Sequence, residues 1–491
     1  MELKTTVTAK KMLEMSGATP FAKKIIQKMV SFLQNFFGSE ILLDVPVDLQ
    51  DVNEEIFPVL KIAEQLKLLG ILERVRKIER TFPDEPYFFR YFSYLGGKVV
   101  GGGADFISEK RALYKSLGEE VERYFWGRTD YFFRGKIKKA SYLEVKENAL
   151  DIFSLTGFSA EQRKEFEILQ FDEKTNFEWI LVNSFTNQKQ AFCPVQLLSV
   201  FYARNHAKTP QSPKKEEAML RWRISTGVAA GQSLEHALLG GILELIERDA
   251  FMITYLNMIA PPQYDHESLS EDEDVAKILA KFRQYNLEVG LFNLPSDFSI
   301  FITMAVIIDR SGAGPAVIVA SSADFNLKNS ILDALSECLA VRVSVRIRWD
   351  KNKKVKRIDQ EGRLIYWANE DNRSKLDFLF QGETEEVDWN EHRNFFSSDQ
   401  SEKTKEDCQK ELDILKKEFS EKKYKLLWKK ISSPEVEKLG FYVVSTVSPD
   451  LQPLHLEEEI PYWSGKRLSE VPRKLGYQSA EKINQVPNPF P

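Results

Sequence analysis

The sequence predicts an α/β (α+β) fold in which helices pack on mixed β-sheet. Three long segments, residues 108–124, 233–255 and 329–346, have the apolar spacing of helices. Between them lie two runs rich in Val, Ile and Phe, residues 300–308 and 316–320, which are bounded by Gly, Pro or Asp as buried strands are. Helical and strand patterns within one stretch of chain favour helices laid against a sheet.

The length and composition limit the possible classes of protein. The chain has 491 residues, enough for two or three domains, with 43% hydrophobic and 29% charged residues. No run of 18 apolar residues is present, so we expect no membrane-spanning helix. The net charge of -5 gives no general affinity for nucleic acid. Three widely spaced cysteines argue against a disulfide framework or a zinc site and predict a cytoplasmic protein.

The pattern along the chain predicts two domains. Residues 1–85 contain amphipathic stretches such as 56–72, and we predict a small, mainly helical domain there that docks a partner or caps the core. The catalytic domain is predicted over residues 86–491. Within it, residues 351–425 are strongly charged and predict a surface excursion with one amphipathic helix, and residues 451–491 form a Pro-rich tail.

Two of the predicted helices carry the same arrangement of carboxylates. The two motifs are Ser116-x-x-Glu119-x-x-Glu122-Arg123 and Glu244-x-x-Glu247-Arg248. Glutamates three positions apart share one helix face and repel each other unless a cation lies between them. Oxygen ligands suit Mg²⁺, which usually keeps a nucleotide phosphate in its remaining positions. One such motif is more often a surface ion pair, but two copies in one predicted core favour a magnesium and nucleotide site.

A glycine-rich segment precedes the second of these helices. Residues 225–231 read Ser-Thr-Gly-Val-Ala-Ala-Gly, and such small residues allow a ligand to approach the backbone beside a helix start. No GxxxxGK[ST] sequence is present, so ATP would be bound without a P-loop. Glu235 in the first turn favours the helix dipole or contacts the ligand, and both interpretations stay open.

Other catalytic motifs are absent from the sequence. The five histidines form no close metal pair, and no Gly-x-Ser-x-Gly sequence occurs. His236 is expected to be a packing residue, and Cys338 a buried, inert thiol.

The two carboxylate motifs and the segment 225–231, in this order and spacing, resemble the nucleotide-site motifs of the YcaO family. The resemblance covers roughly residues 87–491. It implies magnesium ligands at Glu119, Glu122, Glu244, Glu247 and Glu337, and nucleotide contacts from Ser116, Arg123, Ser225, Glu235, Arg248 and Asp333. The chain departs from the family pattern at Thr226, where Asn is common, and at Asp333, where Arg or Gln is usual.

The C-terminal sequence resembles that of azoline-forming YcaO proteins, whose Pro-rich tail reaches the active site. The matching segments are 451–455, 467–468 and 487–491. Proline stiffens such a tail into an extended strand. The resemblance therefore predicts that the carboxylate of Pro491 acts as a positioned catalytic base. Taken alone, a terminal PxPxP would indicate a disordered tail or a ligand for a proline-binding module.

The resemblance implies an ATP- and Mg²⁺-dependent cyclodehydratase. Such an enzyme phosphorylates a backbone amide oxygen of a ribosomal precursor peptide and forms thiazoline or oxazoline rings from Cys, Ser or Thr. The implied partners are the precursor peptide, a leader-binding E1-like (ocin-ThiF-type) protein, a flavin dehydrogenase acting on the product, and a second copy in a homodimer. Three alternatives stay open: a YcaO enzyme that forms a thioamide or amidine, a non-catalytic scaffold that presents peptide, and a general phosphotransferase that acts on small molecules.

Overall fold

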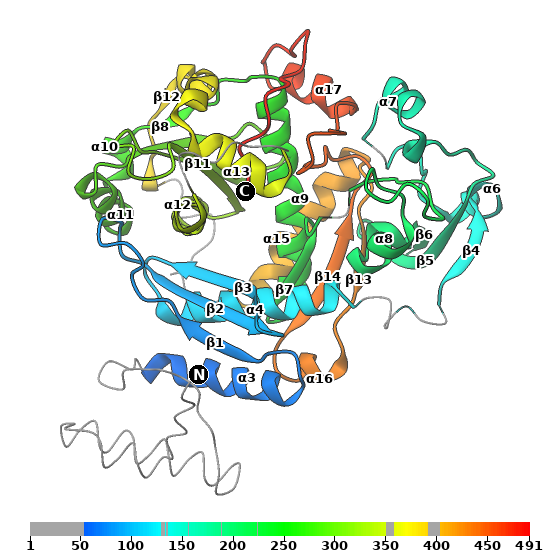
Figure 1. Cartoon of the computed structure of the whole chain (residues 1–491), viewed down its shortest axis with the longest axis horizontal. Coiled ribbons are helices and arrows are strands. Elements are labelled where there is room, and N and C mark those ends of the chain that lie inside the picture. Colours follow the sequence, from blue (N-terminus) through cyan, green and yellow to red (C-terminus); the bar gives the residue numbers. More distant parts are fainter. Residues whose placement is uncertain are drawn as a thin grey trace, which may run out of the picture. The chain divides into compact units, whose positions relative to one another are not determined.

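The computed structural model describes most of the chain, in two compact units (Figure 1). The described residues are 54–128, 133, 136–155, 157–187, 189–222, 224–349, 358–390 and 403–491. Unit 1 holds the described residues up to Glu79 together with Phe89–Gly103 and Ser108–Glu120, and unit 2 holds Arg80–Phe88, Ala104–Ile107 and the residues from Val121 onward. The predicted boundary at residue 85 falls within Arg80–Phe88, and most of residues 1–85 lie outside the described residues, so that division stays a prediction.

Unit 1 combines helices with a small antiparallel sheet. Its elements are η1 (Glu54–Ile56), α3 (Phe57–Leu68), β1 (Arg74–Lys77), β2 (Phe89–Leu95), β3 (Lys98–Asp105) and the first part of α4 (Glu109–Trp126). The strands lie in the order β1-β2-β3. The helix expected within residues 56–72 is confirmed as α3, while the sheet was not predicted.

Two glycines allow β3 to lie directly on α4. A Cβ atom on Gly101 would lie 2.5 Å from the carbonyl oxygen of Ser116, and one on Gly103 would lie 2.0 Å from that of Ala112. Only glycine fits at such distances. The Gly101-Gly102-Gly103 run therefore allows the strand to approach the helix closely.

Unit 2 contains two sheets. One has the order β11-β10-β9-β8-β12, and the other has the order β4-β5-β13-β14-β7 with β6 paired to β5. The strands of the first sheet are β8 (Gln263–Tyr264), β9 (Glu288–Asn293), β10 (Phe301–Ile308), β11 (Val317–Asp324) and β12 (Thr384–Glu385). The strands of the second are β4 (Lys138–Ser141), β5 (Asn176–Ser184), β6 (Gln190–Pro194), β7 (Val228–Gly231), β13 (Leu427–Lys430) and β14 (Tyr442–Val447).

Long helices pack on these sheets. Helix α9 (Leu234–Leu256) contacts β7 and β14 of one sheet and β11 of the other, and α12 (Leu327–Arg348) packs on β10 and β11. The other helices are α6 (Tyr142–Val145), η2 (Lys146–Asn148), α7 (Ala160–Glu165), η3 (Glu167–Leu169), η4 (Val195–Leu197), α8 (Val200–His206), α10 (His266–Leu269), α11 (Glu273–Gln284), α13 (Gln360–Ala368), η5 (Glu370–Gln381), α15 (Lys405–Glu421), α16 (Pro434–Glu437) and α17 (Lys466–Lys474). The predicted mixed α/β fold, its three long helices and its two strands are confirmed.

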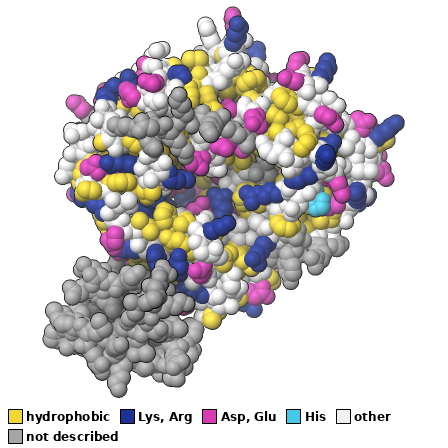
Figure 2. Space-filling view, viewed as in Figure 1, with side chains coloured by type: hydrophobic (Ala, Val, Ile, Leu, Met, Phe, Trp, Pro, Cys, Tyr) yellow, Lys and Arg dark blue, Asp and Glu magenta, His cyan; other side chains and the backbone are white. Residues whose placement is uncertain are grey.

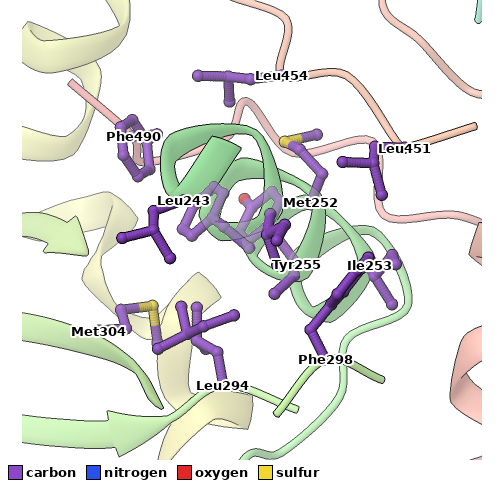
Figure 3. Close-up of a cluster of buried hydrophobic side chains, with 14 of the residues drawn as sticks. Leu243, Met252, Ile253, Tyr255, Leu294, Phe298, Met304, Leu451, Leu454 and Phe490 are labelled. Atoms are coloured by element: carbon purple, nitrogen blue, oxygen red, sulfur yellow. The ribbon is translucent and has the colours of Figure 1, made fainter. Parts of the chain in front are cut away.

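The largest core cluster surrounds α9 (Figure 3). Met252 and Tyr255 of α9 pack with side chains from the sheet, such as Met304, and from the C-terminal segment, such as Leu454 and Phe490. Phe490 is 0% exposed, and burying a side chain of this size contributes about 2 kcal/mol. The end of the chain is thus part of the core of unit 2.

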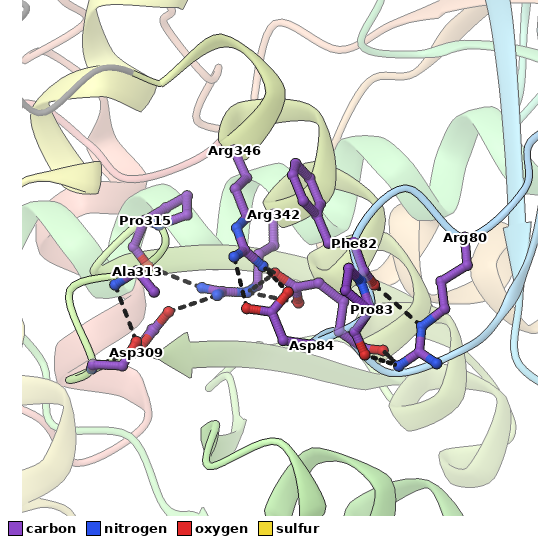
Figure 4. A network of polar contacts seen from close by, with 11 residues as sticks. Arg80, Phe82, Pro83, Asp84, Asp309, Ala313, Pro315, Arg342 and Arg346 are labelled. Carbon is purple, nitrogen blue, oxygen red and sulfur yellow. Dashed lines mark hydrogen bonds and ion pairs between the residues drawn. The ribbon is translucent and has the colours of Figure 1, made fainter.

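A buried ion-pair network joins the segment Arg80–Phe88 to α12 (Figure 4). Arg342, 2% exposed, donates from Nε to both carboxylate oxygens of Glu85, at 3.1 and 3.0 Å. Its two other nitrogens reach Asp309 at 2.6 Å and the carbonyl of Pro315 at 2.9 Å. Because each of the three guanidinium nitrogens donates to an acceptor, the energetic cost of burying the charge is offset.

The charged stretch 351–425 is only partly a surface excursion. Its amphipathic helix is confirmed as α15, which buries Leu415 and Phe419. Helix α13, however, buries Arg363 and Trp367. Both side chains donate hydrogen bonds to carbonyl groups of the C-terminal segment. Residues 351–357 and 391–402 lie outside the described residues.

Acidic and basic side chains are interspersed on the face shown in Figure 2. This mixture agrees with the small net charge of -5. Among the residues that the structure describes, no helix is both long and apolar enough to cross a membrane.

Candidate functional site

The glycine-rich segment and α9 meet at Glu244. The backbone N–H of Gly227 donates to Oε2 of Glu244 at 2.8 Å. Gly227 has φ +83°, and a Cβ atom there would lie 2.6 Å from the carbonyl oxygen of Thr446. The sequence therefore needs glycine at this turn, both for the positive φ and for the close approach to the strand. Helix α9 then begins after Ser233, whose side chain accepts from the N–H of His236 at 3.0 Å.

Glu247, one turn further along α9, is a buried carboxylate among other carboxylates. It is 8% exposed, and its Oε1 accepts a hydrogen bond from Ser321 of β11 at 2.7 Å. Burial above all, together with repulsion from Glu337 and Glu244, raises the pKa of Glu247 to about 8, although Arg248 and Ser321 act in the opposite direction. The ionised form of this group is therefore costly unless a cation joins it.

Arg248 lies between the carboxylates and the C-terminal segment. Its Nη2 donates to Oε1 of Glu244 at 3.2 Å, and its Nε lies 3.6 Å from Oε1 of Glu247. On the other side its guanidinium carbon stands 4.0 Å from the centroid of the Phe490 ring. Such a cation–π contact orients the arginine while leaving N–H groups available.

These residues fit a magnesium ion bound mainly through a phosphate. The negative charges of Glu247, Glu337 and Glu244 repel one another. This repulsion favours the binding of a hard cation that takes oxygen ligands. Within the described part of the chain, no three His, Cys, Asp or Glu side chains form a group that could hold a metal ion by themselves. Glu247 and Glu337 would thus contribute some of the ligands, and phosphate oxygens and water the rest.

The other predicted residues of unit 2 are placed as follows. Glu337 is exposed on α12, and Asp333 is half-buried one turn before it. Ser225 is half-buried, and its carbonyl accepts from the N–H of Val228 at 2.8 Å. Glu235 forms an ion pair with Lys405 of α15, at 3.3 Å. That pairing favours a structural role for Glu235 over a ligand contact.

Helix α4 carries the first motif across both units. In unit 1, Ser116 is fully buried against β3, and Oε2 of Glu119 accepts from the N–H of Gly102 at 2.7 Å. In unit 2, Glu122 and Arg123 form an ion pair of 3.6 Å. The structure therefore groups Glu244, Glu247, Arg248 and Glu337, whereas Ser116 and Glu119 are described with unit 1.

The C-terminal segment is held in place by side chains that the sequence did not reveal. Arg363 donates from Nε to the carbonyl of Phe490 at 2.9 Å, and Trp367 donates from Nε1 to the carbonyl of Pro487 at 3.0 Å. The hydroxyl of Tyr255 also donates to Pro487, at 2.9 Å. Pro491 itself is half-buried. The structure contradicts the alternative of a disordered tail, because these contacts fix it beside Arg248.

The comparisons with known proteins decide the family. A family model described as YcaO cyclodehydratase, ATP- and Mg²⁺-binding, matches residues 104–452. The chain belongs to the YcaO family. The resemblance drawn from the two carboxylate motifs is thereby confirmed.

Solved structures of YcaO proteins share the fold. A heterocyclase in complex with substrate and cofactor aligns with a TM-score of 0.70 and 21% identity, over 88% of this chain and 57% of that chain. YcaO from Methanopyrus kandleri, bound with AMPPCP and Mg²⁺, gives 0.57 and 14%, over 84% and 95%. The Escherichia coli microcin synthetase McbBCD complex gives 0.54 and 12%, over 80% and 91%. The chain thus spans little more than half the length of the first of these proteins.

Proposed function

We propose that this YcaO protein is an ATP- and Mg²⁺-dependent cyclodehydratase that forms azoline rings in a ribosomal peptide. The observation that carries the proposal is the buried carboxylate of Glu247, whose pKa is raised to about 8 beside Glu337 and Glu244. A buried carboxylate whose pKa stays raised even beside an arginine, here Arg248, marks a site where a ligand supplies further positive charge.

In the proposed reaction, the thiol or hydroxyl of a Cys, Ser or Thr attacks the preceding backbone carbonyl. The carbonyl oxygen takes the γ-phosphoryl group of ATP, and ADP is released. Phosphate then leaves as the C=N bond of the ring forms, and the thiol or hydroxyl proton and the amide proton are lost. Overall one water is removed and one ATP is hydrolysed for each ring.

The residues of α9 and α12 would perform the electrostatic part of this reaction. Glu247 and Glu337 would supply carboxylate ligands to magnesium, with Glu244 beside them, and the ion would offset the charge of the transferring phosphoryl group when it is bound. Arg248, oriented by Phe490, would face the phosphate or the oxygen that is phosphorylated. Glu119, Glu122, Arg123, Ser116, Ser225 and Asp333 stay predicted contributors to the same site.

The docked C-terminal segment favours azoline formation over thioamide or amidine formation. Phe490 touches Arg248, so the following residue lies near the proposed site. We propose that the carboxylate of Pro491 removes the amide proton when the ring forms. A variant extended by one residue beyond Pro491 would displace that carboxylate, and unchanged ring formation in it would argue for the thioamide or amidine alternative.

The proposed partners follow from the family. The chain spans 57% of the aligned heterocyclase, and the related microcin synthetase is a complex of several proteins. We propose that a leader-binding E1-like protein delivers the precursor peptide, that a flavin dehydrogenase acts on the product, and that the chain forms a homodimer.

The test is a reconstitution. The protein is incubated with ATP, Mg²⁺, a candidate precursor peptide and its leader-binding partner, and the peptide mass is measured. The proposal predicts the loss of one water per modified residue, together with release of ADP. Binding of peptide without any loss of water, in the presence of ATP, would instead support the scaffold.

A further inference from the structure

Arg363 of α13 is a fully buried arginine that forms no ion pair with any residue that the structure describes. Its side chain is 0% exposed. Its Nε donates to the carbonyl of Phe490 at 2.9 Å, and its Nη1 donates to the carbonyl of Leu456 at 2.9 Å. Its third nitrogen, Nη2, has no hydrogen-bond partner in the described part of the chain. The hydrogen bonds of this guanidinium thus go to two backbone carbonyls, one of them at the end of the chain.

An unpaired arginine is costly in such a place. Burial above all lowers the pKa of Arg363 to about 10, although Glu458 and Glu457 act in the opposite direction. The buried Arg342, by contrast, has two carboxylate partners. A neutral side chain at position 363 would avoid the cost of burying an unpaired charge. The contacts of Arg363 therefore indicate a role beyond stability.

The carbonyl that Arg363 holds belongs to the last peptide bond of the chain. That bond joins Phe490 to Pro491, and its atoms lie in one plane with the Cα atom of Pro491. The proline ring also fixes φ of Pro491 at about −65°. Once the plane is held, the carboxyl carbon of Pro491 has a single place, and only rotation of the carboxylate about the Cα–C bond remains.

Phe490 holds the other side of that peptide plane. Its ring is 0% exposed and packs in the core around α9 (Figure 3). Its N–H donates to Oδ1 of Asn488 at 3.2 Å, and Nδ2 of Asn488 donates to the carbonyl of His455 at 2.9 Å. Among the described residues, the hydrogen bond from Arg363 is the last one before the carboxylate.

We propose that Arg363 is the positioning residue for the carboxylate of Pro491. By holding the carbonyl of Phe490, it sets the peptide plane from which the proline ring places that carboxylate. This inference rests on the proposed function, in which the carboxylate removes the amide proton. It adds a residue of α13, outside both carboxylate motifs, to the groups on which ring formation depends.

The first experiment observes the end of the chain directly, without any reaction. With proline labelled with ¹³C at its carboxyl carbon, Pro491 gives the one proline signal that comes from a carboxylate and not from an amide. In the unaltered protein we expect a broad line, because the carboxylate tumbles with the whole protein. Arg363→Met should lose that broad line and give a narrow one. Arg310→Met, which changes an exposed arginine, should keep the broad line. A broad line in Arg363→Met would overturn the inference.

The second experiment measures the single-turnover rate of ring formation in four proteins: the unaltered chain, Arg363→Met, a chain extended by one glycine, and a chain with both changes. A general base contributes on the order of 10²–10⁴-fold, so the extension should slow ring formation at least about a hundredfold. Arg363→Met should slow it at least about tenfold, because a misplaced base loses much of its effect. Both changes together should be no slower than the extension alone, because Arg363 acts through the carboxylate.

Two outcomes of this comparison would overturn the inference. Effects that multiply would assign Arg363 a structural role, and a full rate in the extended chain would remove the carboxylate on which Arg363 is said to act.

Two controls separate positioning from a loss of folding or of nucleotide binding. Arg363→Met leaves no carboxylate without its partner, so its melting temperature should fall much less than that of Arg342→Met. Binding of AMPPCP with Mg²⁺ should stay within about twofold. A loss of AMPPCP binding would show that Arg363 acts through Arg248, and would overturn the inference. If Arg363→Met does not fold, Arg363→Lys replaces it in both experiments, because lysine keeps the charge but lacks the planar fork that holds two carbonyls.

The two proposals fail in different ways. If the unaltered protein removes no water from the peptide, the proposed function is wrong whatever the ¹³C line shows. If rings form and the extension slows them but Arg363→Met does not, only the role of Arg363 is wrong.

Discussion

Two buried clusters of charged side chains in unit 2 differ in how the energetic cost of burying their charges is offset. Around Arg342, every carboxylate faces a guanidinium, and although burial raises the pKa of Asp309, hydrogen bonds from Ser311 and Arg342 lower it overall. Around Glu247, carboxylates face one another, and the pKa is raised to about 8. In the first group Arg342 and Arg346 offset the charges of Glu85 and Asp309, and the group holds segments of the fold together. The second has a single arginine, Arg248, for the carboxylates of Glu244, Glu247 and Glu337, and a Mg²⁺ ion would supply the missing positive charge.

The largest expected effect on stability comes from the Arg342 network. Arg342→Met leaves Asp309 buried without its cation and leaves Glu85 with Arg346 alone, at 2.7 Å, which costs about 3–5 kcal/mol of unfolding free energy. Urea denaturation measures the change. A loss below about 1 kcal/mol would show that the network is not the closed ion-pair system that its distances indicate.

The matched control is an exposed pair. Arg310 binds Glu288 at 2.6 Å, but the two side chains are 53% and 54% exposed. Arg310→Met should cost at most about 1 kcal/mol, because water solvates the remaining carboxylate. Equal costs for the two arginine variants would remove the distinction between buried and exposed pairs.

For a substitution of Glu247 we expect a small effect on stability and a large effect on ring formation. Glu247→Gln keeps the shape of the side chain and an oxygen that can accept from Ser321, and it removes a carboxylate that has an ionisation cost. At about pH 4, where the carboxyl of Glu247 is protonated in the folded chain and largely so in the unfolded one, we expect the unfolding free energy without ligand to change by less than about 1 kcal/mol. Ring formation in the reconstitution should fall at least about a hundredfold, because a magnesium ligand is lost. A variant that is strongly destabilised would show that Glu247 is a structural residue instead.

The same carboxylate makes stability depend on pH. Its folded-state pKa of about 8 lies above the unfolded value of about 4.3, so its contribution to stability is complete below the unfolded value and is lost as the pH rises through the folded one. Without magnesium or nucleotide, we therefore expect Glu247→Gln to gain stability relative to the unaltered chain between about pH 4.5 and 8. Parallel stability curves for the two proteins would contradict the raised pKa.

Local patterns in the sequence predicted much of the fold but only one part of the site. The periodicity of residues 233–255 and the run 300–308 correspond closely to α9 and β10, since each pattern reports burial along a single element. The carboxylates of α9 could be predicted as part of a site because glutamates three positions apart share one face of a helix. Arg342 and Glu85, by contrast, are 257 positions apart, and no local pattern joins them.

The same reason explains why the contacts of the C-terminal segment were not predicted. Arg363 lies 127 positions from Phe490, and its charge suggested a surface residue. A short strand such as β1, with four residues of which only Val75 is buried, gives too little periodicity to be recognised, which is one reason why the sheet of unit 1 was missed.

The most direct test of the central claim is the shift of the melting temperature on addition of AMPPCP with Mg²⁺. A ligand that binds only the folded state raises that temperature, and the rise grows with the logarithm of the ligand concentration divided by its Kd. We expect a clear rise for the unaltered protein, a smaller one with AMPPCP alone, and almost none for Glu247→Gln. An equal rise in both proteins would contradict the assignment of the carboxylates on α9 to magnesium and nucleotide.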